Sequence, residues 1–140
     1  MSKEAQHVTP LPAIGSRASR TRTISEEDIT LFAQISGDTN PLHLDEEYAA
    51  QTFFGRRIVH GSLVASLISA VLGNDLPGPG SIYLGQTLKF IAPVHIGDTI
   101  TVTVETIAVR EEKRLVTLHT ECTNQDGKTV LVGEATIKYP

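Results

Sequence analysis

The chain has 140 residues, of which 40% are hydrophobic and 20% are charged, and its formal net charge at pH 7 is -4. This length is typical of one compact domain with its own core, and the acidic balance argues against nucleic-acid binding through a basic surface. The single cysteine, Cys122, excludes an intrachain disulfide and a cysteine-based metal cluster, so we expect a reducing, cytoplasmic location.

The sequence predicts neither export nor membrane insertion. Residues 1–10 are polar and lack the apolar stretch of a secretory signal. The longest apolar run, 63–72, is well short of the roughly 20 residues that a membrane-spanning helix needs. Residues 1–16 include two prolines and a glycine without a hydrophobic period, so we expect an N-terminal tail. One domain should follow over 17–140, beginning with a short strand over 17–23.

A helix over 26–35 is the first firm element. Ser25 and Asp28 have the spacing of a capping box, in which each side chain bonds to the backbone of the other residue. A glycine follows the helix, and Pro41 lacks the N–H donor that a continuing helix would need. We therefore expect residues 38–44 to form a loop.

Two further helices are predicted before the sheet. The first starts at Asp45, whose side chain can cap a helix, and continues to the two phenylalanines before Gly55. The second covers 61–74 and is apolar on every face, a pattern typical of a helix surrounded by other structure. We expect this second helix to lie at the centre of the fold.

The rest of the sequence is rich in β-branched residues with a period near two, which is typical of strands. The predicted strands cover 82–91, 99–110, 114–123 and 129–139. Short turns join them, so they should be antiparallel and form a sheet that wraps the central helix in an α+β fold. A long exposed edge strand would promote aggregation, so we expect a second subunit to cover the sheet edge in a homodimer.

A carboxylate and an imidazole, those of Asp38 and His43, stand five residues apart between the first two predicted helices. On one continuous helix they would point about 140° apart, so joint action requires the loop that Pro41 supports. In such a loop the two groups can act on one water as an acid–base pair. The alternative is structural, with Asp38 closing the turn and His43 packing as a partly buried polar group.

Gly61 marks a candidate oxyanion site at the start of the central helix. Free N–H groups and the positive end of the helix dipole lie there, and a glycine lets a substrate approach the backbone. The alternative is that Gly61 only allows the chain to turn, with Ser62 capping the helix. No histidine stands at ligand spacing from the acidic residues 45–47, so we expect no metal site, and we assign His60 a structural role.

Segment 36–45, which contains Asp38, Asn40, Pro41 and His43, resembles the hydratase signature of the MaoC-like family. The resemblance continues through 58–61, 80–86 and 90–98 and so covers most of the chain. In particular, the chain resembles small bacterial (R)-specific enoyl-CoA hydratases that supply polyhydroxyalkanoate synthesis from fatty-acid oxidation. The resemblance implies a hot-dog fold, a homodimer with residues of both chains around each site, and a loop-shaping or supporting role for Asn40 and Pro41.

By the same resemblance, the chain would add water reversibly, on one face, to a trans-2-enoyl-CoA and yield the (3R)-3-hydroxyacyl-CoA, with short acyl chains expected. Asp38 would remove a proton from the water, and His43 would hold the water and help return a proton to C2. The Gly61 N–H would stabilise charge on the thioester oxygen, and Ser62 would contact the substrate or the overhanging segment. No cofactor is implied, because coenzyme A is part of the substrate.

Three alternatives remain open. The same fold hosts acyl-CoA thioesterases, because fold does not fix function, although the loop with Asp38 and His43 favours a hydratase. A non-catalytic module that binds acyl thioesters is the second alternative. The third is a dehydratase that acts on acyl carrier protein, an acidic partner that Arg56 and Arg57 would attract.

Overall fold

The computed structural model describes residues 9–140, so the first half of the expected tail, 1–8, lies outside the described residues. In chain order the elements are β1 (Arg17–Thr23), α1 (Glu26–Ser36), α2 (Pro41–Leu44), α3 (Glu46–Ala50), α4 (Gly61–Asn74), β2 (Ile82–Gln86), β3 (Lys89–Phe90), β4 (Thr99–Arg110), a 3-10 turn (Glu111–Lys113), β5 (Leu115–Thr123) and β6 (Thr129–Lys138). Within this range, no helix combines the length and the apolar character that crossing a membrane requires.

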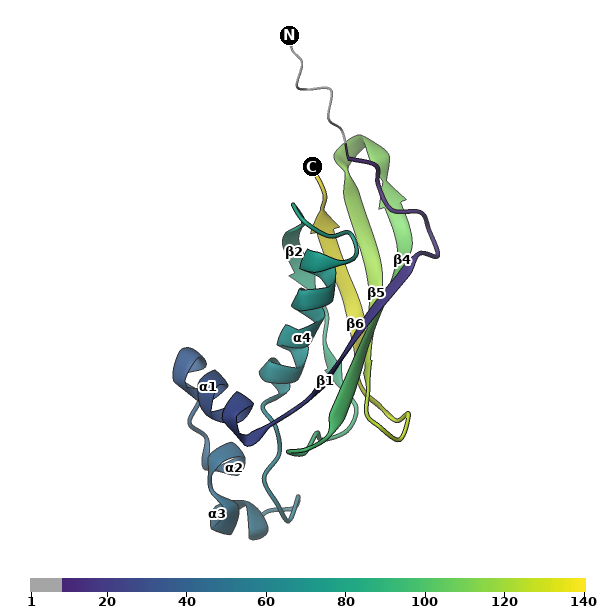
Figure 1. Cartoon of the computed structure of the whole chain (residues 1–140). Coiled ribbons are helices and arrows are strands. Elements are labelled where there is room, and N and C mark those ends of the chain that lie inside the picture. The colour runs from purple at the N-terminus through teal and green to yellow at the C-terminus, as the bar shows by residue number, and fades with distance from the viewer. Residues whose placement is uncertain (1–8) are drawn as a thin grey trace.

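The strands form one antiparallel sheet in the order β1-β4-β5-β6-β2, and β3 also pairs with β6 (Figure 1). The alternation expected over 99–110 is confirmed in β4, where Ile100, Val102 and Val104 are buried and the intervening residues are partly exposed. Together, the antiparallel sheet and the helices confirm the predicted α+β class. β1 and β2 form the two edges of the sheet.

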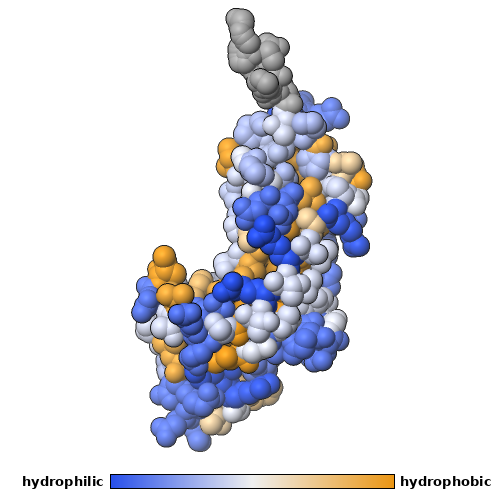
Figure 2. Space-filling model, viewed as in Figure 1, coloured by the Kyte–Doolittle hydropathy of each residue, from blue (hydrophilic) through white to orange (hydrophobic). Residues whose placement is uncertain are grey.

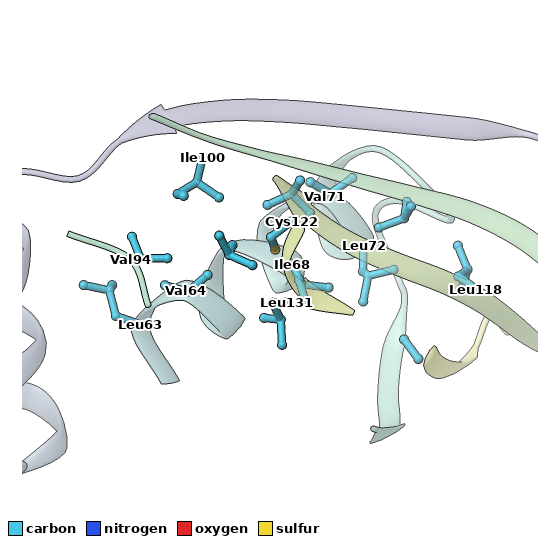
Figure 3. Close-up of a cluster of buried hydrophobic side chains, with 14 of the residues drawn as sticks. Leu63, Val64, Ile68, Val71, Leu72, Val94, Ile100, Leu118, Cys122 and Leu131 are labelled. Atoms are coloured by element: carbon cyan, nitrogen blue, oxygen red, sulfur yellow. The ribbon is translucent and has the colours of Figure 1, made fainter. Parts of the chain in front are cut away.

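α4 packs along one face of the sheet and supplies the centre of the core (Figure 1). Figure 3 shows its side chains directed toward those of Ile100, Leu118 and Leu131 on the strands. The buried residues of α4 are Leu63, Val64, Ile68, Val71 and Leu72. Fully burying one such side chain stabilises the fold by about 1.5–3 kcal/mol, so this cluster holds the helix against the sheet. A long helix wrapped by an antiparallel sheet is the predicted hot-dog architecture.

The exposure of α4 differs from the prediction. Ser66 and Ser69 are exposed, so other parts of the chain do not surround this helix on every side. Cys122 on β5 is fully buried in the core that α4 shares with the sheet. Burial raises the pKa of the Cys122 thiol to about 12, so the thiol is neutral at physiological pH.

The strand predicted over 82–91 is divided into β2 and β3. Its pairing register with β6 shifts after Tyr83. At Thr87 the chain runs so close to β6 that a Cβ atom on Gly133 would lie 1.8 Å from the Thr87 main-chain oxygen. The Thr87 N–H donates to the main-chain oxygen of Glu134 at 2.8 Å. The strand is interrupted because, near Thr87, the backbone departs from the regular pattern of hydrogen bonds with β6.

Two predictions about the connection between the helices are wrong. Residues 38–44 are not all loop, because α2 begins at Pro41. Proline suits the first position of a helix, where its missing N–H leaves no intrahelical bond unmade. α3 ends at Ala50, before the two phenylalanines, because the Thr52 hydroxyl donates to the Ala49 main-chain oxygen at 2.7 Å and so competes with the helical pattern.

Helices α1, α2 and α3, residues 26–50, form an overhang that stands to one side of α4 and the sheet (Figure 1, left). The predicted capping box is confirmed at its start. The Ser25 hydroxyl accepts from the Asp28 N–H at 3.1 Å, and the Asp28 carboxylate accepts from the Ser25 N–H at 3.0 Å. Gly37 ends α1 in the left-handed conformation, with a φ of 78°. The overhang carries Asp38 and His43 toward the start of α4.

Candidate active site

Asp38 lies in the exposed turn between α1 and α2. Its N–H donates to the Ser36 hydroxyl at 3.0 Å, and its carboxylate accepts from the Asn40 N–H at 3.2 Å. The Asn40 side chain in turn accepts from the Leu42 N–H at 3.0 Å and caps α2. These bonds give Asn40 a loop-shaping position, and Pro41 starts the helix that follows. They leave the second oxygen of the Asp38 carboxylate available for a substrate or a water.

His43 is held inside the overhang, with only 8% of its surface exposed. Its Nδ1 lies 2.8 Å from the main-chain oxygen of Ile58. Because a carbonyl oxygen only accepts hydrogen bonds, Nδ1 carries a proton, and the Nε2 atom of a neutral His43 therefore presents a lone pair. A lone pair at Nε2 can accept a proton or hold a water.

His60, for which a structural role was predicted, lies beside this pair. It is 1% exposed, and its Nε2 lies 3.0 Å from the main-chain oxygen of Asp38. Its ring stacks on that of His43, with 4.0 Å between centroids and 28° between planes. Burial is the main cause that lowers the pKa of His60 below its ordinary value, so the neutral ring is favoured. The signals for His60 in the sequence were its position next to Gly61 and its place in segment 58–61, which shares the family resemblance.

Asp38, His43 and His60 each bring one oxygen or nitrogen atom to within 4.8 Å of the others. Such a group raises the question of a metal ion, although no metal site was predicted. The lone pair of an imidazole nitrogen lies in the plane of its ring, so two stacked rings direct their lone pairs side by side. A metal needs them to converge on one point about 2.1 Å from each nitrogen. The arrangement suits a water shared by Asp38 and His43 better than a metal.

Gly61 begins α4, and His60 is the residue before the helix. The start of α4 has no side-chain cap, and Ser62 is exposed, so the capping role proposed for Ser62 is wrong. A Cβ atom on Gly61 would lie 2.8 Å from the Phe90 ring. The glycine therefore permits a close approach to the backbone at the helix start, next to the cluster of Asp38, His43 and His60.

Two mainly apolar cavities lie close to this cluster, and neither lining includes Asp38, His43 or His60. The larger, about 740 Å³, lies between α1, α4, β1 and β4, and Phe32 and Leu63 are among its lining residues. The smaller, about 370 Å³, is lined by Phe54, Gly61 and Phe90 together with neighbouring apolar residues. Figure 2 shows apolar side chains exposed over α1, at the rim of the larger cavity. The larger cavity reaches the cluster through Phe32, which packs on the His60 ring, and the smaller one through Gly61. An apolar acyl chain therefore has lined space near the polar cluster.

The two arginines that were expected to attract an acidic carrier protein differ in their exposure. Arg56 is exposed, whereas the Arg57 side chain is only 10% exposed and bonds to Glu26. A guanidinium that is largely covered and already paired with Glu26 is not available to attract a partner. The part of that prediction that rests on Arg57 is therefore wrong.

The chain is similar to several known proteins. The model of the MaoC like domain family matches residues 11–127. A relative from Rhodospirillum rubrum, named (R)-specific enoyl-CoA hydratase, is 56% identical over 90% of this chain and 87% of its own. One from Methylorubrum extorquens, named 3-hydroxybutyryl-CoA dehydratase, is 51% identical over 85% of this chain and 75% of its own. The solved structure of an (R)-hydratase from A. caviae involved in PHA biosynthesis is 46% identical, with a TM-score of 0.88 over 96% of this chain and 99% of that one. The chain belongs to the MaoC-like family.

Proposed function

We propose that the chain is an (R)-specific enoyl-CoA hydratase, which adds water reversibly to a trans-2-enoyl-CoA and forms the (3R)-3-hydroxyacyl-CoA. The observation that carries this proposal is the convergence of Asp38 and His43, whose polar atoms lie within 4.8 Å of each other. One water with two hydrogen bonds of ordinary length fits that spacing. The related hydratases support the same reaction.

Asp38 and His43 divide the acid–base work. His43 holds the water through Nε2, and Asp38 removes a proton as the water oxygen forms its bond to C3. The electrons of the double bond move toward the thioester, and the proton that Asp38 removed is passed through His43 to C2 on the same face, which completes a syn addition. Positioned acid–base groups of this kind contribute about 10²–10⁴ in rate.

The Gly61 N–H is the proposed hydrogen-bond donor to the thioester oxygen, on which negative charge develops as C3 is attacked. The first N–H groups of a helix have no intrahelical partner and carry a partial positive charge. An oxygen that reaches the Gly61 N–H at the start of α4 is therefore stabilised in the transition state. The exposed Ser62 is a second candidate contact for the substrate.

The reaction adds the elements of water and transfers no electrons, so acid–base groups suffice. We infer that no cofactor takes part and that coenzyme A enters only as part of the substrate. Short acyl chains are the proposed substrates, supported by the relative named 3-hydroxybutyryl-CoA dehydratase. The related (R)-hydratase involved in PHA biosynthesis supports a link to polyhydroxyalkanoate precursors. We propose fatty-acid oxidation as the source of the substrate and the cytoplasm as the location.

We also propose a homodimer formed along the β2 and β3 edge of the sheet. This edge exposes large apolar side chains, which a monomer would leave in water: Ile82, Tyr83, Leu84, Leu88, Phe90 and Ile91. An open strand edge with apolar side chains favours pairing with a second chain. Because Phe90 contacts Gly61, pairing at this edge would place partner residues near each site.

The enzymatic proposal is tested by following the loss of enoyl absorbance with crotonyl-CoA and with a medium-chain enoyl-CoA, followed by chiral analysis of the product. We expect rapid formation of the (R)-product, fastest with the short chain. Free thiol is measured in parallel, because release of coenzyme A faster than hydration would identify a thioesterase. Absence of both reactions would favour a binding module or a carrier-protein substrate.

The dimer is tested by sedimentation of the wild type and of Leu84→Lys, which places a charge on the exposed edge. Ile107→Lys, on β4 and away from the edge, is the matched control. We expect twice the chain mass for the wild type and the control, and a shift to the monomer for Leu84→Lys. A monomeric wild type contradicts the proposed dimer.

A further inference from the structure

His60 is the buried residue that contacts both members of the proposed catalytic pair. Its Nε2 lies 3.0 Å from the Asp38 main-chain oxygen, and its ring stacks on His43 at 4.0 Å. Phe32 of α1 packs against the same ring, with 4.9 Å between centroids. The ring is therefore fixed between the overhang and the start of α4.

The hydrogen bond determines which nitrogen of His60 carries the proton. The Asp38 oxygen can only accept, so Nε2 donates, and Nδ1 of the neutral ring is an acceptor. Nδ1 is buried and has no hydrogen-bond partner within residues 9–140. An unpaired buried acceptor destabilises a fold, and an apolar side chain of similar size would avoid that cost. This imbalance points to a role for the Nε2–H donor.

We propose that His60 is the positioning residue of the Asp38 and His43 pair, an inference that rests on the proposed hydration reaction. It holds Asp38 through the main-chain bond and supports His43 through the stacked ring. Asp38 follows Gly37, and its Ser36 and Asn40 bonds are local to the turn. The bond to His60 ties that turn to the start of α4, and so sets Asp38 relative to the Gly61 N–H.

A neutral His60 also suits the stacked arrangement. His43 carries a positive charge whenever it holds the proton that is to be returned to C2. A second charged ring 4.0 Å away would repel that state, whereas a neutral ring does not. The burial of His60 favours its neutral form.

Three substitutions separate the donor from the ring. His60→Gln places an amide N–H as many bonds from Cα as Nε2, His60→Asn places it as many bonds from Cα as Nδ1, and His60→Phe keeps a ring without a donor. We expect kcat to fall about 10²-fold in the Phe and Asn variants, the loss typical of a misplacement by about 1 Å, with KM changed less than about 2-fold. His60→Gln should recover most of that loss.

The ranking of the kcat values of the three variants tests the inference. A kcat in His60→Phe equal to that of the wild type, or equal losses in the Gln and Asn variants, would overturn it. Melting curves accompany the kinetics, so that each rate refers to folded protein.

A second measurement does not depend on activity or on the variants. Nitrogen NMR of the wild type labelled with ¹⁵N-histidine, at about pH 7.5, should show a neutral ring protonated at Nε2 for His60. A ring protonated at Nδ1, or at both nitrogens, would overturn the inference. If the wild type shows this tautomer and yet does not hydrate enoyl-CoA, the proposed function fails while the hydrogen bond from His60 to Asp38 stands.

Discussion

The Nε–H of Arg57 donates a hydrogen bond of 2.7 Å to the main-chain oxygen of His43, in α2 of the overhang. The same guanidinium forms paired bonds of 2.8 and 2.7 Å with the Glu26 carboxylate at the start of α1. One side chain thus joins α1 and α2 to the segment that leads into α4. Three donors in one plane are a geometry that arginine supplies and lysine does not.

Arg57→Lys should therefore reduce both stability and turnover. A lysine cannot bond to Glu26 twice and to His43 at the same time, so we expect a loss of about 1–3 kcal/mol in the free energy of unfolding, with a lower kcat. Arg17→Lys is the matched control, because Arg17 forms an exposed pair with Glu105 that contributes little. Equal effects of the two substitutions on urea unfolding and on kcat would contradict this role.

Asp38→Asn should abolish most of the hydration activity without unfolding the chain. The amide keeps an oxygen that can accept from the Asn40 N–H, but it cannot take a proton from water. We expect kcat to fall about 10²–10⁴-fold at an unchanged melting temperature. Glu27→Gln, the same acid-to-amide change on the exposed surface of α1, should have no effect. Full activity of Asp38→Asn would favour a binding module in place of an enzyme.

Gly61→Ala should reduce hydration by blocking the approach of the thioester to the helix start. The added Cβ would lie 2.8 Å from the Phe90 ring, a side chain that can shift more readily than backbone, so the fold should persist. Alanine keeps the backbone N–H, so the effect comes from blocked access to this donor. We expect at most the loss of about 10²–10³ in kcat that follows removal of one oxyanion donor. The double variant Gly61→Ala with Phe90→Ala removes the clash. Recovery of full activity in the double variant would assign the effect to the displaced ring and not to the oxyanion site.

Gly133→Ala should destabilise the fold strongly. Its Cβ would lie 1.8 Å from the Thr87 main-chain oxygen, and backbone cannot move aside as a side-chain end can. Overpacking of this kind costs about 3 kcal/mol. Gly73→Ala, in the last turn of α4 with open space around it, should be neutral or slightly stabilising. Thermal melting compares the two, and similar melting temperatures would disprove the close approach.

His60 should make the folded chain less stable in acid. Burial holds its folded pKa below 6.5, the ordinary value at which the unfolded chain takes up the proton. As the pH falls through 6.5, the unfolded state binds the proton first, so the free energy of unfolding decreases. Of the facing groups, His43 lowers this pKa further and Asp38 opposes the shift.

The measurement is the urea midpoint at about pH 7.5 and about pH 5.5, for the wild type and for His60→Gln. The amide does not titrate, so the variant should lose less stability between the two values. An equal loss in both proteins would show that other groups cause the acid sensitivity.

Local sequence signals predicted much of the fold. The capping box of Ser25 and Asp28, the helix over 61–74 and the alternation over 99–110 all lie within short stretches of chain, and the structure confirms each of them. Asp38 and His43 were also predicted, from one short segment, to form the acid–base pair. Their spacing and the intervening proline are local properties, readable before any tertiary contact is known.

Tertiary structure decided what links distant segments. His60 meets Asp38 across 22 positions, Arg57 meets Glu26 across 31, and Thr87 crosses β6 beside Gly133. Periodicity and propensity do not predict these contacts, because each joins segments that are distant in the sequence and meet only when the chain folds. The sequence by itself determined the two longest helices, α1 and α4, most of the strands and the proposed acid–base pair. Only the folded chain decided which buried side chains hold that pair in place.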